Sequence, residues 1–139
     1  MAEATAVILE HRGLLRIGGA ERCAFLQGIV SNDVERVTPE TTIWAAFLTP
    51  QGKFLHEFFL AEDGETFLLD CEADRAADLA RRLKLYKLRA QVTVEPAEDL
   101  AVVALVGAAA LDHLGLPAEP GRAAAFGGGL VFVDPRLAA

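Results

Sequence analysis

The hydrophobic positions of the first 70 residues fall into short runs that are typical of strands. Five runs are strand-like: 7–9, 14–17, 42–49, 54–60 and 66–70. A turn over 11–13 joins the first two runs. Pro50 and Gly52 lie between the third and the fourth, and they favour a hairpin because Pro presets one turn dihedral and Gly accepts a left-handed one. The last three runs therefore predict a meander in the middle of an antiparallel sheet.

Two other segments place their apolar side chains at helical spacing. The first covers 20–29 and ends at Ser31–Asp33, whose side chains bond the local backbone and favour a turn. The second covers 72–86 and carries one apolar stripe of mostly alanine and leucine. Acidic residues stand at its start and basic residues at its end, an order that complements the helix dipole. A sheet strand over 89–95 should follow.

The pattern changes at 96–99, which we interpret as a boundary between a first domain, 7–95, and a second module or truncated remainder of the fold, 96–139. In the second part we expect a buried strand over 101–106, a short helix over 108–114, a loop over 117–129 and a last strand over 130–133. Hairpins dominate and no regular βαβ repeat occurs. The predicted fold class is α+β, an antiparallel sheet with packed helices.

Composition narrows the classes of function. The chain has 139 residues, 53% of them hydrophobic, with a formal net charge of −7. An acidic surface repels nucleic-acid backbones, so we expect no DNA partner. No apolar run is long enough to span a membrane and no signal peptide is evident, so we expect a cytoplasmic protein. Cys23 and Cys71 stand apart, outside any metal-binding spacing, and are interpreted as small buried hydrophobes.

Candidate chemistry is sparse. No phosphate-binding glycine loop, metal-ligand pair or nucleophile elbow occurs, so we expect no metal and assign no catalytic residue. His56 and Glu57 are adjacent titratable residues in an apolar strand, where neighbours point to opposite faces. Either one of them orients a ligand, or both lie on solvated patches at a sheet edge. From the residues alone we favour the second interpretation.

Three further features have both a structural and a functional interpretation. Asn32 and Asp33 form a helix stop, the favoured interpretation, or the polar rim of a cleft. Trp44 belongs to the core by default, or else walls a planar heterocycle. Five of the 13 basic residues lie within nine positions: Arg81, Arg82, Lys84, Lys87 and Arg89. They complement a helix end or attract a carboxylate-rich or phosphate-bearing partner.

Four ordered motifs resemble a known family. They are the segments HRGLLRI at 11–17, FLQGIVSNDV at 25–34, LTPQGKFLH at 48–56 and YKLRAQV at 86–92. Together they resemble the N-terminal region of YgfZ-type folate-binding proteins and, more distantly, the glycine-cleavage aminomethyltransferase. The resemblance covers about 7–95 well and extends loosely to Leu137. It implies the N-terminal module of the aminomethyltransferase fold, in which three modules surround a tetrahydrofolate.

The resemblance also implies which residues could contact that cofactor. Trp44 stands where the family commonly has Tyr, and His56–Glu57 stand where the aminomethyltransferases carry Asp–Asp. The implied folate contacts are Asn32, Asp33, Trp44, His56 and Glu57. The implied contacts to the glutamate tail are Arg81, Arg82, Lys87 and Arg89.

The family resemblance implies a folate-binding accessory protein for iron–sulfur protein assembly or repair, with iron–sulfur proteins as clients. The altered Asp–Asp pair argues against aminomethyl transfer, so the chain is expected to be non-catalytic. The family's Lys-Gly-Cys-Tyr hallmark segment does not occur in these residues, so the chain is either a fragment or a short homologue. The alternatives are a tetrahydrofolate-dependent one-carbon transferase, or a module that binds a protein or a tRNA.

Overall fold

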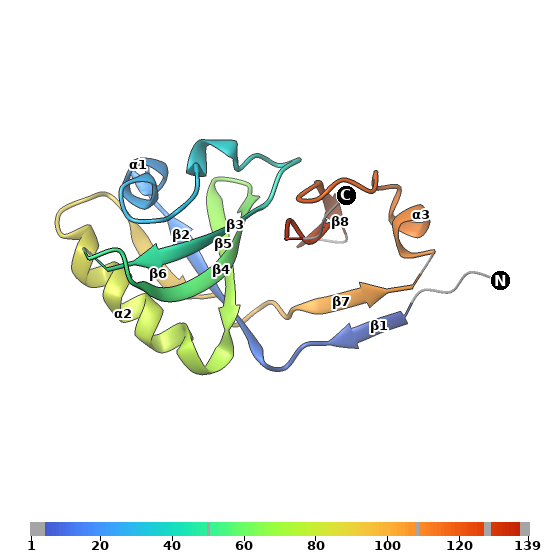
Figure 1. Cartoon of the computed structure of the whole chain (residues 1–139), viewed down its shortest axis with the longest axis horizontal. Helices are drawn as coiled ribbons and strands as arrows, with labels where there is room; N and C mark the ends of the chain where they lie inside the picture. Colours follow the sequence, from blue (N-terminus) through green and yellow to red (C-terminus); the bar gives the residue numbers. More distant parts are fainter. Residues whose placement is uncertain (1–4, 50, 108, 127–128, 137–139) are drawn as a thin grey trace.

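The computed structural model describes residues 5–49, 51–107, 109–126 and 129–136. Its centre is a five-stranded antiparallel sheet with the order β3-β4-β5-β2-β6 (Figure 1). Its strands are β2 (Arg12–Gly18), β3 (Ile43–Leu48), β4 (Phe54–Asp63), β5 (Thr66–Glu72) and β6 (Thr93–Pro96). The predicted meander is confirmed as β3-β4-β5, and it lies at one side of the sheet with β3 at the edge.

One face of this sheet is covered by helices. These are α1 (Arg22–Gln27), a 3₁₀ turn at Val34–Arg36, and α2 (Ala76–Lys87), which a 3₁₀ turn at Ala73–Arg75 precedes. Alternate strand residues such as Leu15, Phe58 and Leu69 point to this face and pack with Leu26 and Leu83 of the helices. Burying these side chains is the main force that holds the helices on the sheet.

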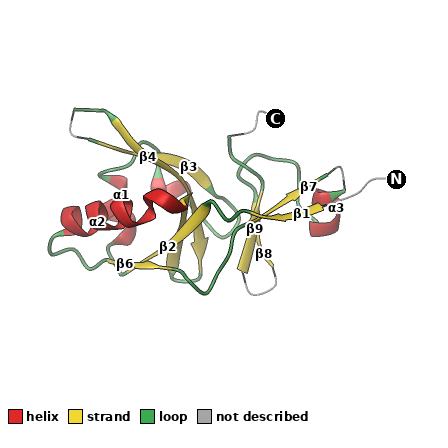
Figure 2. Cartoon of the chain, turned by 90° about the horizontal axis from the view of Figure 1, so that it is seen from below, coloured by secondary structure: helices red, strands yellow, loops and turns green. Residues whose placement is uncertain are grey.

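The opposite face of the sheet meets a second layer built from both ends of the chain (Figures 1 and 2). Strand β1 (Thr5–Ile8) pairs with β7 (Val103–Val106) in an antiparallel ribbon, and β8 (Ala123–Phe126) pairs with β9 (Gly129–Phe132) in a hairpin. Helix α3 (Ala110–Leu114) lies in the same layer. The ring of Phe132 on β9 packs 5.4 Å from that of Phe59 on β4, which joins the hairpin to the sheet.

The α+β class is confirmed, and the differences from the expected elements have local causes. The strand expected over 101–106 is shorter and not buried, because it belongs to a two-stranded ribbon whose Val103 and Val106 are about half exposed. The expected loop 117–129 contains β8, which forms through its pairing with β9. Strand β6 starts only at Thr93, because the chain first turns at Lys87–Ala90, where the Ala90 N–H donates to Lys87 O (2.8 Å).

The two cysteines differ in their surroundings. Cys71 lies in the core as expected, and burial raises its pKa to about 11, which keeps the thiol protonated. Cys23 is only half-buried at the edge of the same core. Within the described ranges, no helix has the length and apolar character needed to cross a membrane.

Candidate functional site

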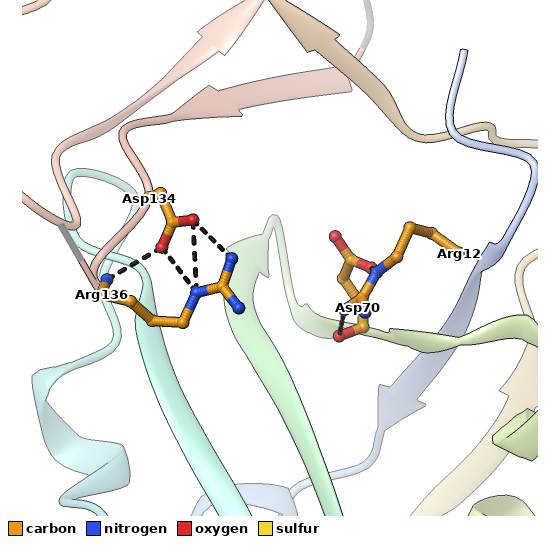
Figure 3. A network of polar contacts seen from close by, with 4 residues as sticks. All are labelled: Arg12, Asp70, Asp134 and Arg136. Carbon is orange, nitrogen blue, oxygen red and sulfur yellow. Dashed lines mark hydrogen bonds and ion pairs between the residues drawn. The ribbon is translucent and has the colours of Figure 1, made fainter. Parts of the chain in front are cut away.

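A cavity of about 730 Å³ lies between the helix-free face of the sheet and the second layer. The sheet contributes Leu14, Ala61 and Leu68, while the second layer contributes mainly apolar side chains of β7 and β9. Its volume is in the range of small-molecule sites, which are mostly apolar with a few convergent polar groups. Four charged residues supply those polar groups here: Arg12, Asp70, Asp134 and Arg136 (Figure 3).

Arg12 and Asp70 form the ion pair on the sheet side of the cavity. Arg12 is on β2 and Asp70 on β5, with Arg12 Nε donating to Asp70 Oδ1 (2.7 Å) and Arg12 Nη2 to Asp70 O (2.8 Å). Burial raises the pKa of Asp70, and the guanidinium partly opposes that shift. Among the described residues Arg12 engages only one carboxylate oxygen, so Asp70 Oδ2 is available as a hydrogen-bond acceptor.

Asp134 and Arg136 form the second ion pair, in the segment after β9. Arg136 Nη2 donates to Asp134 Oδ2 (2.7 Å) and its backbone N–H to Asp134 Oδ1 (2.9 Å). These hydrogen bonds lower the pKa of Asp134 and keep it ionised. The guanidinium of Arg136 also lies 4.8 Å from the centroid of the Phe59 ring, and that of Arg12 lies 5.6 Å from it.

Phe59 thus connects the two ion pairs, and the arrangement favours one class of ligand. An apolar cavity with an aromatic ring suits a planar heterocycle. A buried carboxylate with a free oxygen suits a ligand that presents N–H donors, while guanidinium groups suit ligand carboxylates. In the described part of the chain, no three His, Cys, Asp or Glu side chains converge as metal ligands.

The side chains of Asn32 and Asp33 form hydrogen bonds with backbone groups. Asn32 Nδ2 donates to Trp44 O (2.9 Å), and its Oδ1 accepts from the Asp33 N–H (2.8 Å). Asp33 Oδ1 accepts from the Glu35 N–H (3.0 Å) and so caps the 3₁₀ turn that follows. The turn part of the favoured interpretation is confirmed, whereas α1 already ends at Gln27 with Gly28 as its C-cap, so the pair is not what stops the helix.

His56 and Glu57 lie on opposite faces of the sheet, as the strand period requires. Glu57 is exposed, but His56 is 3% exposed beneath α2, where its Nε2 lies 2.8 Å from Asp78 Oδ2. The expectation that both are solvated was therefore wrong for His56, because β4 is an inner strand and α2 covers that face. Trp44 is opposite Phe59 on the helix-free face and 38% exposed, so its default core position was also wrong.

The basic residues lie on the other side of the sheet from the cavity. Arg81 Nη2 and Arg82 Nε, both on α2, each donate to Asp78 at 2.8 Å, while Lys87 and Arg89 lie at and beyond the end of the helix. None of the nine residues that the resemblance implied lines the described cavity. Their part in ligand binding stays a prediction, and the fold does not bring all nine together.

Sequence reasoning missed the four charged residues of the cavity. Two signals were present: Asp70 is an acid inside the strand-like run 66–70, and Arg12 stands at the start of another strand. A charged residue inside an apolar strand is rarely buried without a partner. The partnership of β2 with β5, which joins them, is not visible in the local pattern.

The sequence of the chain is similar to that of known proteins. No protein-family model matches the chain. The Homo sapiens iron–sulfur cluster assembly factor IBA57, a mitochondrial protein, is 32% identical over 145 aligned positions, which cover 94% of this chain and 39% of that protein. The Mus musculus IBA57 protein is 32% identical over 116 positions, 73% of this chain and 32% of that protein. The chain is similar to IBA57 assembly factors over most of its own length.

Structural comparison confirms the expected fold. The crystal structure of the glycine cleavage system aminomethyltransferase T from Bartonella henselae matches with a TM-score of 0.70 and 22% identity, over 84% of this chain and 33% of that one. The aminomethyltransferase fold is thus shown, whereas the comparisons do not distinguish the YgfZ type from IBA57. The chain spans about a quarter to two fifths of the length of the IBA57 relatives it matches.

The expected cytoplasmic location was wrong. The IBA57 relatives from Homo sapiens, Mus musculus and Pyricularia oryzae are all mitochondrial proteins by name, which conflicts with a purely cytoplasmic protein. The expectation rested on the lack of a secretory signal and of a membrane segment. Neither feature separates the cytoplasm from the interior of an organelle.

Proposed function

We propose that this chain serves in the assembly of iron–sulfur proteins. The observation that supports the proposal is its similarity to IBA57 assembly factors over 94% of its length in the human comparison. The described residues contain no cluster of metal ligands, so the proposed role is that of an accessory factor for iron–sulfur client or assembly partners.

Deleting the encoding gene in its own organism tests this role. The expected result is reduced activity of several iron–sulfur enzymes, with unchanged activity of enzymes that carry no cluster. Re-expression of the gene should restore the lost activities. Equal activities of the iron–sulfur enzymes with and without the gene would contradict the proposal.

We further propose that the cavity binds a tetrahydrofolate or a derivative, as the family resemblance implies. Its volume of about 730 Å³ and its apolar lining are compatible with a pterin. Asp70 would accept hydrogen bonds from the N–H edge of the heterocycle, Phe59 would lie along the ring, and Arg136 would attract a ligand carboxylate. Folate itself would supply a carrier for one-carbon groups.

Calorimetric titration of tetrahydrofolate into this chain tests the cavity assignment. Arg136→Met removes a guanidinium from the cavity and should weaken binding by about tenfold, the value of one charge-assisted hydrogen bond. Arg122→Met is the matched control, because Arg122 pairs with Glu119 at the surface and lies outside the cavity lining. Absence of binding by the unaltered chain would contradict the assignment. Loss on Trp44→Ala but not on Arg136→Met would move the site to the predicted residues.

A further inference from the structure

The end of α2 carries apolar side chains that the fold leaves in solvent. Leu85 is 61% exposed and Leu88 82% exposed, whereas nearly all other described leucines are buried or half-buried. Tyr86 is 44% exposed, and its ring meets the edge of Phe47 on β3 at 5.5 Å. We call the exposed side chains of Leu85, Tyr86 and Leu88, at and just beyond the end of the helix, the α2-end surface.

Leu88 occupies a backbone conformation that disfavours leucine. It has φ 48° and ψ −111° and is the first central residue of the Lys87–Ala90 turn, a position that favours glycine because a Cβ is crowded there. The side chain is almost wholly in solvent, so burial within this chain does not offset the strain. Strained backbone of this kind is concentrated at functional sites.

The surroundings of this surface are strongly basic in an otherwise acidic protein. Residues 78–94 include five Lys and Arg and one acidic residue, Asp78, which pairs with Arg81 and Arg82. The segment therefore has a net charge of +4 (five minus one), against −7 for the whole chain. Arg81, Lys84 and Leu85 are three and four positions apart, so they share one side of the helix, and Leu88 follows one turn later. All four are exposed and point away from the core residues Leu79 and Leu83.

From this combination we infer that the α2-end surface docks a partner protein through a segment in which carboxylates surround apolar side chains. The exposed leucines supply apolar anchors, and the basic residues attract and orient an acidic segment. RNA is disfavoured as the partner, because phosphate groups are bound by charged and polar side chains and would leave the exposed leucines without a contact. The surface lies at the opposite end of the molecule from α3, β1 and β7, and on the other side of the sheet from the cavity (Figures 1 and 2). The docking inference is therefore independent of the proposed folate site.

Fluorescence anisotropy with defined probes tests the inference. The first probe is a labelled 15-residue peptide, about two thirds glutamate, with leucines one helical turn apart. The second replaces its leucines by serine, and the third is a single-stranded RNA of about the same length. We expect the leucine peptide to bind at least about tenfold more tightly than the serine peptide, because apolar anchors add to the charge attraction.

Variants locate the binding. Leu85→Ser combined with Leu88→Gly should weaken the leucine peptide by about tenfold, and so should Arg81→Glu combined with Lys84→Glu. Ile8→Ser on β1 and Arg122→Glu are the matched controls, because they change an exposed apolar side chain and an exposed arginine outside both the surface and the cavity lining. Leu88→Gly by itself should raise the Tm by about 4 °C, since it relieves the strained turn, so binding that is lost in this single variant cannot be ascribed to unfolding.

Three outcomes would overturn the inference. Equal binding of the leucine and serine peptides would leave only a charge effect. Binding of the leucine peptide that is unaffected by the leucine variants would place it elsewhere. RNA binding that is tighter than peptide binding and insensitive to the leucine variants would assign the surface to nucleic acid.

Discussion

His56 and Glu57 show how much a single residue's role depends on the face it occupies. The two are neighbours on β4, yet one is buried beneath α2 and the other is in solvent. The same alternation places Phe59 and Asp70 on the cavity side, while Phe58 and Leu69 enter the core. At the residue scale, the face of the sheet on which a side chain lies therefore decides whether that side chain is in the core or on the cavity side.

Gly19 provides a prediction at this scale. Its φ is 101°, and a Cβ there would collide with the carbonyl group of Gln91 in the segment leading into β6. Gly19→Ala should lower the free energy of unfolding by about 3 kcal/mol, because it adds a backbone clash to an unfavourable dihedral. Gly52→Ala is the control: its φ is 83° but the space around it is open, so it should cost only about 1 kcal/mol. Equal losses in urea denaturation would contradict this account.

At the scale of elements, α2 is joined to the sheet by polar contacts as well as by its apolar stripe. Asp78 accepts hydrogen bonds from Arg81 and Arg82 on its own helix and lies 2.8 Å from His56 Nε2 on β4. These hydrogen bonds lower the pKa of Asp78, so its carboxylate is ionised and the Nε2 atom of His56 carries the proton. One acidic side chain thereby links the helix to the inner strand.

This link predicts a pH dependence of stability. Burial lowers the pKa of His56, with nearby Arg75 and Arg82 adding to the shift and the Asp78 hydrogen bond opposing it. The unfolded chain therefore binds a proton at a higher pH than the folded chain does, and stability is lost as the pH falls from about 6.5 through the folded pKa of His56. His56→Gln should show a smaller loss of unfolding free energy between about pH 7 and pH 5.

Urea denaturation of both proteins across that range measures the effect. Asp70 works in the opposite direction, because its raised pKa favours the folded state at low pH, but it is present in both proteins and cancels in the comparison. Parallel pH profiles for the wild type and His56→Gln would show that His56 titrates alike in both states.

At the scale of the whole molecule, two layers meet on the helix-free face of the sheet and line the cavity between them. The second layer combines β1 from the start of the chain with β7 to β9 from its end, so the cavity exists only when both ends have folded. The contact between Phe59 and Phe132, with Arg136 over the Phe59 ring, is one link between the layers, beside the backbone hydrogen bond from Ala123 N–H to Glu40 O (2.8 Å).

Phe132→Ala should loosen this link without unfolding the sheet. An aromatic pair contributes about 1 kcal/mol beyond its buried area, so amide hydrogens of β8 and β9 should exchange at least about fivefold faster in the variant. Exchange in β4 and β5 should stay unchanged. Phe126→Ala is the control, because Phe126 is on the same hairpin but 55% exposed. A uniform increase across the chain would contradict separate layers.

The sequence by itself determined the meander β3-β4-β5, the helix near 72–86, the turn at Asn32–Asp33 and the α+β class. These depend on local properties: the two-residue period of strands, the helical period and the dihedral preferences of Pro, Gly and Asx residues. The resemblance of four motifs added the aminomethyltransferase fold, which the structural comparison confirmed.

Only the tertiary structure decided which face each side chain occupies, which strands from opposite ends of the chain pair, and where a cavity forms. Arg12 meets Asp70, and Phe59 meets Phe132, through contacts between segments far apart in the sequence. Such contacts arise from burial of apolar surface and pairing of buried charge, which depend on the whole arrangement. No local pattern contains that information, and the candidate site was therefore visible only after the sheet and its second layer had been brought together.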